Sequence, residues 1–376
     1  MDFNPKKHAR YFLRLLNILP SHASNYDSTR LLLCFFAVSG LDLLDALDQL
    51  TPEKKEHIRE WVYHLLIQAK ESDGDDEVAR WGFQGASTLI LPPATGVIDN
   101  SEPYACGHVS MTYTGLGTLL ILGDDLSRVN RKVVAAGVRA CQQSDGSFCA
   151  TLAGSECDMR FVYSAAAVCY ILQDWSGMDV GLTTNYIMQS LVSHNFFQLL
   201  PGFTMIFLIN HDDIFQSYDN AFAQGPGLES HGGHTFCAVA SLSLMGTLHT
   251  MLSTRQLDGL RRWCMMRQES GFNGRPNKPV DTCYSFWVGA TLKILDCYDL
   301  INKSENRSFT LATQDNITGG FAKWTSTDVE PLHTYFALAG LSLLKEPGLI
   351  EIHPELNLSQ RTVEHLHKLH EQWTCN

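Results

Sequence analysis

The sequence lacks a long unbroken apolar run, a surplus of positive charge and any segment with the strong alternation of a half-buried strand. Its longest apolar stretch, from Phe196 to Ile209, is interrupted by Gln, Pro, Gly and Thr, whereas a membrane-spanning helix needs about 20 predominantly apolar residues in a row. We therefore expect no stable membrane insertion. Asp and Glu number 40 against 28 Lys and Arg, a formal net charge of -12. This balance argues against nucleic acid as a partner, because phosphate backbones bind basic surfaces.

The cysteines lack the arrangement of a disulfide scaffold. Eleven of them are scattered along 376 residues, and residues 1–10 are polar and basic rather than an apolar secretion signal. We therefore expect a reducing, cytoplasmic location and no disulfide framework. Hydrophobic residues make up 45% of the chain and charged residues 18%, which is enough apolar material for a large buried core.

What the chain does contain is internal repetition. Turns that place glycine before an aromatic residue precede apolar runs again and again, for example at Trp81-Gly82-Phe83, Gly271-Phe272 and Gly319-Gly320-Phe321. The apolar runs are nearly free of charge, as in helices buried on all sides, and they alternate with runs that carry charge on one face. Alternation with a period of roughly 45 to 55 residues predicts an all-α fold, a closed α/α toroid built as a barrel of helical hairpins.

The predicted inner and outer helices can be placed along the chain. Apolar helices are expected over 108–122, 159–172, 284–295 and 333–344 and in a run that ends at Met245, and helices with one polar face over 128–143, 255–268 and 362–373. In a closed ring the starts of the inner helices lie at one end of the central cavity. Arg160, Cys283 and His333 stand near three such starts and His231 just before another, so they can share one site despite their separation in sequence.

One segment breaks the period. Between Phe148 and Leu228 the repeat is too long, and residues 192–216 show neither the glycine-aromatic turn nor a helical period. We interpret the chain as a single domain, 1–376, with an insertion at 192–216. The insertion is either a natural surface loop or translated intron sequence, and the sequence leaves both open.

Asp281, Cys283 and His333 carry the most specific chemistry. A carboxylate, a thiolate and an imidazole form a three-ligand zinc set, and three protein ligands leave the fourth tetrahedral position open for catalysis. Spacing alone favours a simpler interpretation, a buried cysteine and an aspartate at a helix start, and the residues that flank them favour the metal site. Cys283 could also serve as a nucleophile, but the neighbouring Asp281 and His333 fit metal ligation better.

Four segments around these residues resemble one known family. They are GRPNKPVDTCYSFW at 274–287, HGGHTF at 231–236, GGFAKW at 319–324 and LHTYFALAGLSLL at 332–344. They resemble the β subunits of protein prenyltransferases, with most similarity to the type I geranylgeranyltransferase branch. The resemblance runs from Arg30 to Leu344 apart from the insertion, and the α/α barrel of that family agrees with the repeat pattern.

The resemblance implies an enzyme that transfers a geranylgeranyl group from its diphosphate to the cysteine of proteins ending in CaaX with X = Leu, small GTPases among them. It also implies one zinc ion on Asp281, Cys283 and His333, and an α subunit as the partner in a heterodimer. A substrate cysteine in the open zinc position would become a thiolate and attack the first carbon of the isoprenoid. Two alternatives remain: a protein farnesyltransferase β subunit, and a non-catalytic helical-repeat scaffold that has kept the fold.

The resemblance also assigns roles to single residues. It places diphosphate binding on His231, Arg275, Lys278 and Tyr284, although Arg275 and Lys278 could also be ordinary cations on a solvated loop. Lys323 stands where farnesyltransferases carry a magnesium-binding Asp, so it is expected to stabilise the diphosphate as a catalytic residue without Mg²⁺. The remaining expectations are the substrate-binding residues Arg160 in the cavity lining, Trp287 on the isoprenoid, and His108 and Leu332 beside the CaaX peptide.

One position departs from the family pattern. Leu32 stands where a type I enzyme is expected to have a small Thr that makes room for the longer isoprenoid. This departure leaves the strictness of the isoprenoid length open.

Overall fold

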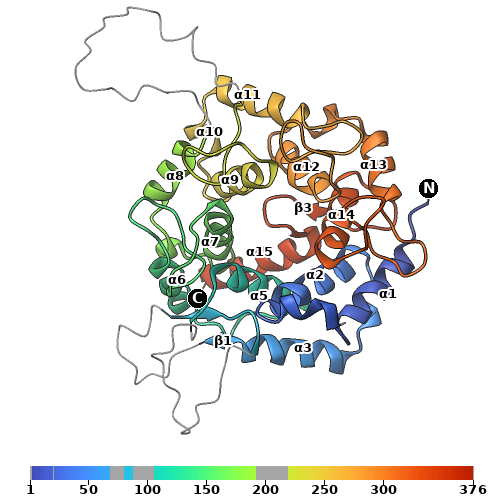
Figure 1. The fold of residues 1–376 in the computed structure, drawn as a ribbon. Helices are drawn as coiled ribbons and strands as arrows, with labels where there is room; N and C mark the ends of the chain where they lie inside the picture. The colour runs from blue at the N-terminus through green and yellow to red at the C-terminus, as the bar shows by residue number, and fades with distance from the viewer. Residues whose placement is uncertain (1, 20, 68–79, 88–105, 192–218, 376) are drawn as a thin grey trace, which may run out of the picture.

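The computed structural model describes residues 2–19, 21–67, 80–87, 106–191 and 219–375. In this part of the chain six apolar helices form an inner ring: α2 (Arg30–Leu43), α5 (Val109–Ile121), α7 (Met159–Leu172), α9 (Gly232–Leu244), α12 (Tyr284–Ile294) and α14 (Pro331–Leu343). Each packs against the next, and α14 packs against α2, so the ring is closed (Figure 1). The predicted all-α toroid is confirmed.

Helices with one polar face surround the ring. They are α1 (Pro5–Leu15), α3 (Pro52–His64), α6 (Arg131–Ala140), α8 (Val180–Gln189), α11 (Thr254–Met265) and α13 (Lys303–Ala312), with the short α10 (Leu248–Met251) and the 3₁₀ turns η1 (Ser21–Tyr26), η2 (Leu47–Gln49), η4 (Trp175–Gly177) and η5 (Tyr298–Leu300) between elements. Their starts are set by local capping. Asn130 caps α6 by accepting the amide of Val133, and Ser253 and Gln256 form a reciprocal capping box on α11.

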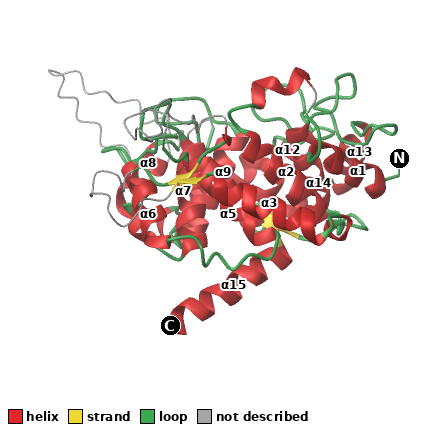
Figure 2. Cartoon of the chain, turned by 90° about the horizontal axis from the view of Figure 1, so that it is seen from below, coloured by secondary structure: helices red, strands yellow, loops and turns green. Residues whose placement is uncertain are grey.

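Strands contribute little to the described residues. They form two antiparallel pairs of two residues each, β1 (Leu66–Ile67) with β2 (Gly82–Phe83) and β3 (Ile352–His353) with β4 (Leu358–Ser359). The final helix, α15 (Gln360–Cys375), extends from one end of the barrel (Figure 2). No helix in the described ranges is long and apolar enough to cross a membrane.

The chain that follows α14 closes the barrel below the inner ring. Three tyrosines of the inner helices donate their hydroxyls to consecutive backbone carbonyls of this segment: Tyr163 to Glu355 at 3.0 Å, Tyr113 to Leu356 at 2.7 Å and Tyr335 to Asn357 at 2.9 Å. Because these hydroxyls are buried, each needs such a partner. The carbonyls of residues 355–357 therefore tie the segment to three inner helices.

The first helix packs onto the ring through a close approach at Gly40. A Cβ atom at this position would lie 2.2 Å from the ring of Phe12, which is completely buried. Gly40 therefore lets α1 lie directly on α2. Substitution of a buried phenylalanine such as Phe12 by alanine lowers the free energy of unfolding by about 3–5 kcal/mol.

The cysteines differ from the expectation in one respect. A local disulfide joins Cys149 and Cys157, whose Cα atoms are 4.3 Å apart in the loop before α7, while the other nine cysteines are free. Spacing did not reveal the pair because the loop folds back on itself, with a β-bridge between the two residues. The insertion predicted at 192–216 lies outside the described residues.

Candidate metal and substrate site

The three predicted metal ligands meet at one end of the barrel. Asp281 and Cys283 lie at the start of α12, and His333 lies in the first turn of the adjacent α14. One ligand atom from each residue lies within 4.8 Å of the other two. Direct packing of α12 on α14, two neighbouring inner helices, brings residues 50 apart in sequence to this distance, so the repeat argument and the geometry agree.

Local hydrogen bonds explain how the two ligands of α12 are held. The Asp281 carboxylate accepts the backbone N–H of Cys283 at 3.0 Å, which bends this side chain back to the start of the helix. Beneath it the Thr282 hydroxyl is hydrogen-bonded to the carbonyl of Ala322 at 2.8 Å. The turn before α12 is thus hydrogen-bonded to the turn before α14.

The charges and protonation of Asp281, Cys283 and His333, here called the metal trio, favour binding of a cation. The Nε2 atom of His333 lies 3.0 Å from Oδ1 of Asp281. Burial alone would lower the pKa of His333, but Asp281 and Glu330 raise it to about 9. Burial raises the pKa of the Cys283 thiol well above its usual value. A divalent ion would replace these protons, and one sulfur, one nitrogen and one carboxylate oxygen are a donor set that zinc accepts.

Lys323 lies at the edge of the trio. Its Nζ atom is 3.5 Å from Oδ2 of Asp281 and 4.5 Å from the ring centre of Trp324. The Trp324 indole is itself held by the carbonyl of Val280 at 2.8 Å. A half-exposed ammonium group therefore lies beside Asp281, and its role with a diphosphate stays a prediction.

His231 and Tyr284 form a second part of the site. His231 caps α9, and its Nδ1 accepts the backbone N–H of Gly233 at 3.1 Å. Nδ1 therefore carries no proton, and the remaining nitrogen, Nε2, donates to the Tyr284 hydroxyl oxygen at 2.8 Å. Burial, His234 and the charge of Arg275 lower the pKa of His231 to about 4, so it stays neutral. This arrangement leaves the Tyr284 proton free to be donated to a substrate.

The two predicted cations before α12 behave differently. Arg275 forms an ion pair with Glu229 at 2.7 Å, and its charge still acts on His231 and Tyr284. Lys278 is exposed on the same turn. The structure therefore brings together His231 and Tyr284, with Arg275 nearby, and leaves Lys278 at the surface.

Arg160 and His108 continue the site along the rim. The guanidinium of Arg160 forms a bidentate pair with Asp158, the buried N-cap of α7, at 3.0 and 2.6 Å. His108 caps α5 by accepting the backbone N–H of Ser110 at 3.1 Å. Arg160 and His108 thus lie at the starts of two inner helices, as predicted.

Aromatic rings fill the space below this rim. Trp287 lies 4.1 Å from Phe336 and 5.2 Å from Phe236, measured between ring centres. Leu332 is half-buried beside His333, and Leu32 is half-buried on α2. These side chains give the inside of the ring an apolar wall.

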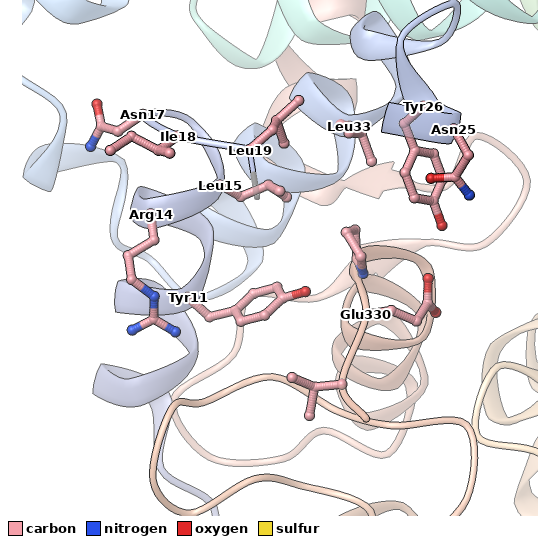
Figure 3. A pocket seen from close by; sticks show the side chains of 12 residues that line it. Tyr11, Arg14, Leu15, Asn17, Ile18, Leu19, Asn25, Tyr26, Leu33 and Glu330 are labelled. Atoms are coloured by element: carbon pink, nitrogen blue, oxygen red, sulfur yellow. The ribbon is translucent and has the colours of Figure 1, made fainter. Parts of the chain in front are cut away.

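A cavity of about 840 Å³ opens between α1, η1, α2 and the start of α14, and Glu330 on its wall contacts His333. Figure 3 shows Tyr11, Tyr26, Leu33 and Glu330 on its wall. Glu330 is a residue that the sequence analysis missed. The signal was available, because a polar residue directly before Pro331 at an expected helix start is typical of an N-cap. This cap also explains why α14 begins two residues before the predicted start at His333.

A family comparison identifies the fold. The family model described as "Prenyltransferase alpha-alpha toroid domain" matches residues 3–197 and 210–358. The chain belongs to the prenyltransferase family. The match extends beyond the range from Arg30 to Leu344 in which the sequence motifs showed the resemblance.

Individual prenyltransferases agree with this result. The chain is 36% identical to the "Geranylgeranyl transferase type-1 subunit beta" of Arabidopsis thaliana, over 95% of this chain and 89% of the relative. It is 35% identical to the Dictyostelium discoideum protein of the same name, over 95% of this chain and 96% of the relative. The fold matches the solved structure "Candida albicans protein geranylgeranyltransferase-I complexed with GGPP" with a TM-score of 0.78 and 24% identity, over 98% and 99% of the two chains. The predicted resemblance to type I β subunits is confirmed.

Proposed function

We propose that this chain is the catalytic β subunit of a zinc-dependent protein geranylgeranyltransferase type I. It would transfer the geranylgeranyl group to the cysteine of CaaX proteins with X = Leu, such as small GTPases. The observation that carries the proposal is the meeting of Asp281, Cys283 and His333 within 4.8 Å, beside Lys323 and the His231–Tyr284 pair. Similarity to type-1 β subunits along 95% of the chain supports the same conclusion.

The chemistry follows from charge placement. Zinc on the trio supplies a cation that keeps the substrate thiol deprotonated at neutral pH. The thiol proton goes to solvent, the sulfur–carbon bond forms at the first carbon of the isoprenoid, and the carbon–oxygen bond to diphosphate breaks. Tyr284 would donate its proton as a hydrogen bond to the leaving diphosphate, and Arg275 and Lys323 would balance its developing charge. A donor that existing hydrogen bonds already hold in place needs little reorientation during this step, so the free-energy cost of reorganisation is small.

The other substrate-binding roles belong to the same proposal. Lys278 would reach the diphosphate from the surface, Trp287 would contact the isoprenoid, and Arg160, His108 and Leu332 would border the CaaX peptide. Lys323 would remove the need for Mg²⁺. The α subunit is the proposed partner in a cytoplasmic heterodimer, and the domain division of 1–376 with an insertion at 192–216 remains a prediction.

A transfer assay tests the proposal. The chain is co-expressed with an α subunit and given geranylgeranyl or farnesyl diphosphate, with and without Mg²⁺, and peptides ending in Leu or Met. We expect transfer of the geranylgeranyl group to the Leu peptide without Mg²⁺. Preference for the farnesyl group would favour the farnesyltransferase alternative, and Leu32 is the residue that would explain it.

A metal measurement separates the enzyme from a scaffold that has only kept the fold. The enzyme is expected to hold about one zinc ion per chain, as a three-ligand catalytic site does. Well-folded heterodimer without zinc and without transfer would leave the scaffold as the better explanation.

A further inference from the structure

Glu330 links the metal trio to the cavity wall. As the N-cap of α14, its carboxylate accepts the backbone N–H of His333 at 2.6 Å and that of Leu332 at 3.2 Å. These two bonds fix the carboxylate at the helix start. The same Oε1 atom is also hydrogen-bonded to Nδ1 of the His333 ring. One oxygen therefore binds both the backbone and the side chain of the same histidine.

A second contact reaches this carboxylate from η1. The Tyr26 hydroxyl forms a hydrogen bond with Glu330 across the wall of the 840 Å³ cavity. Figure 3 shows the two side chains pointing toward one another, Tyr26 from η1 and Glu330 from the start of α14. Glu330 thus has partners on α14 and on η1, so its position does not depend on one element alone.

The contact fixes which nitrogen of His333 can serve a metal. A carboxylate accepts hydrogen bonds, so Nδ1 must carry the proton. Nε2, which faces Asp281 at 3.0 Å, is then the nitrogen whose lone pair is available once its proton leaves. A charged acceptor behind an imidazole also makes the ligating nitrogen more basic and holds the plane of the ring.

We propose that Glu330 is a positioning residue of the metal centre, which orients His333 and selects its Nε2 as the ligand, and that Tyr26 supports Glu330 in this role. This inference rests on the proposed function, because it assumes that Asp281, Cys283 and His333 hold zinc. It adds a charged residue and a tyrosine of η1 to a site built from α12 and α14.

Zinc affinity is the direct test. The heterodimer with its α subunit is stripped of metal and titrated with Zn²⁺ against a chromophoric chelator. Glu330→Gln keeps an oxygen for the helix cap but removes the charge, and we expect zinc to bind about 10- to 100-fold more weakly. Tyr26→Phe, which keeps the ring and loses one hydrogen bond, is expected to weaken zinc binding about threefold. With Co²⁺ in place of Zn²⁺, the visible absorption bands of Glu330→Gln should shift, because the ring of His333 is held differently.

A cap variant elsewhere separates positioning from simple helix stabilisation. Asn130→Ala removes the N-cap of α6 on the outer ring, and it should lower the thermal midpoint without changing zinc affinity or the Co²⁺ spectrum. If Glu330→Gln behaves like Asn130→Ala, with a lower midpoint and zinc affinity within twofold of the parent, the inference is overturned.

The outcome also distinguishes this inference from the proposed function. Failure of the parent heterodimer to bind zinc would sink the metal centre itself. If the parent binds zinc tightly and Glu330→Gln and Tyr26→Phe bind it with the same affinity, only the role of Glu330 is refuted.

Discussion

The Nζ atom of Lys323 lies 3.5 Å from the Asp281 carboxylate, so a lysine and a predicted metal ligand share one edge of the site. The ammonium is attached to the turn before α14, whose carbonyls at Ala322 and Lys323 accept the Thr282 hydroxyl at 2.8 and 2.9 Å. A positive charge is therefore held next to the ion that would activate the substrate sulfur. This placement suits a group that neutralises a leaving diphosphate.

Removal of this charge should slow transfer. We expect Lys323→Ala to lower kcat about 10- to 100-fold, since loss of one charge-stabilising group has effects of this size, and to leave zinc content unchanged. Part of the activity should return with added Mg²⁺. Single-turnover transfer with and without Mg²⁺ measures both effects. Lys132→Ala, on the exposed face of α6, is the matched control and should behave as the parent; an unchanged rate in Lys323→Ala would contradict the role.

Tyr284→Phe tests the second part of the site. The variant keeps the ring and removes the hydroxyl that lies 2.8 Å from His231. Because the proton would be donated mainly to the leaving group, we expect kcat to fall about 10- to 100-fold with little change in KM. Steady-state kinetics of the heterodimer measure the two constants.

Tyr298→Phe provides the control for that experiment. The Tyr298 hydroxyl is buried and has no hydrogen-bond partner within the described residues. Its removal should therefore leave transfer unchanged and should not lower stability, because no hydrogen bond is lost. Equal kinetics in Tyr284→Phe and Tyr298→Phe would show that the Tyr284 hydroxyl has no part in the reaction.

Cys283→Ala should abolish metal binding. The sulfur is one of three ligand atoms, so its loss leaves a carboxylate and an imidazole that hold zinc weakly. We expect zinc content to fall from about one ion per chain to near zero, measured by atomic emission after dialysis. Cys375→Ser, at an exposed cysteine of α15, should keep the full content. Zinc retained at the parental level in Cys283→Ala would place the ion elsewhere.

Acid should loosen the packing of α1 through His8. This histidine is buried, its Nδ1 accepts the N–H of Gly320 at 3.0 Å, and its Nε2 lies 3.3 Å from Gln314 Oε1. Burial lowers its pKa to about 4, below the unfolded value of about 6.5. The unfolded chain therefore binds the proton first, and stability falls as the pH drops from about 6.5 to 4.

The size of this effect can be isolated with one substitution. Over that interval His8 should account for about 3 kcal/mol of lost stability. His8→Gln, which cannot take up the proton, should show a flatter pH dependence of the denaturant midpoint between pH 7 and 4. Parallel curves for the parent and His8→Gln would mean that His8 is not held neutral.

Periodicity was enough to predict five of the six inner helices and the meeting of their starts, and only α2 (Arg30–Leu43) was missed. The run from Met159 to Leu172 coincides with α7, and Asp281, Cys283 and His333 meet because neighbouring repeats pack their inner helices α12 and α14 side by side. Diphosphate roles for His231 and Tyr284 came only from family resemblance, since no local pattern relates residues 53 positions apart. The hydrogen bond between them shows that the fold brings the two side chains into contact.

Other features depend on contacts that a sequence pattern does not encode. The link from Tyr26 through Glu330 to His333 joins η1 to α14, and only the N-cap at Glu330 leaves a local signal. The pairing of Cys149 with Cys157 depends on a turn with no periodic signature. The segment from Glu355 to Asn357 has neither helical nor strand periodicity, so its position under the ring follows from the tyrosine hydroxyls that bind its carbonyls.

The segment of residues 355–357 covers one end of the ring. Its three carbonyls are bound by Tyr113, Tyr163 and Tyr335, and the Tyr335 hydroxyl also lies 3.1 Å from the side-chain oxygen of Asn357. A ligand that entered the ring from the end with Asp281, Cys283 and His333 would therefore be stopped by backbone from a part of the sequence beyond the last inner helix.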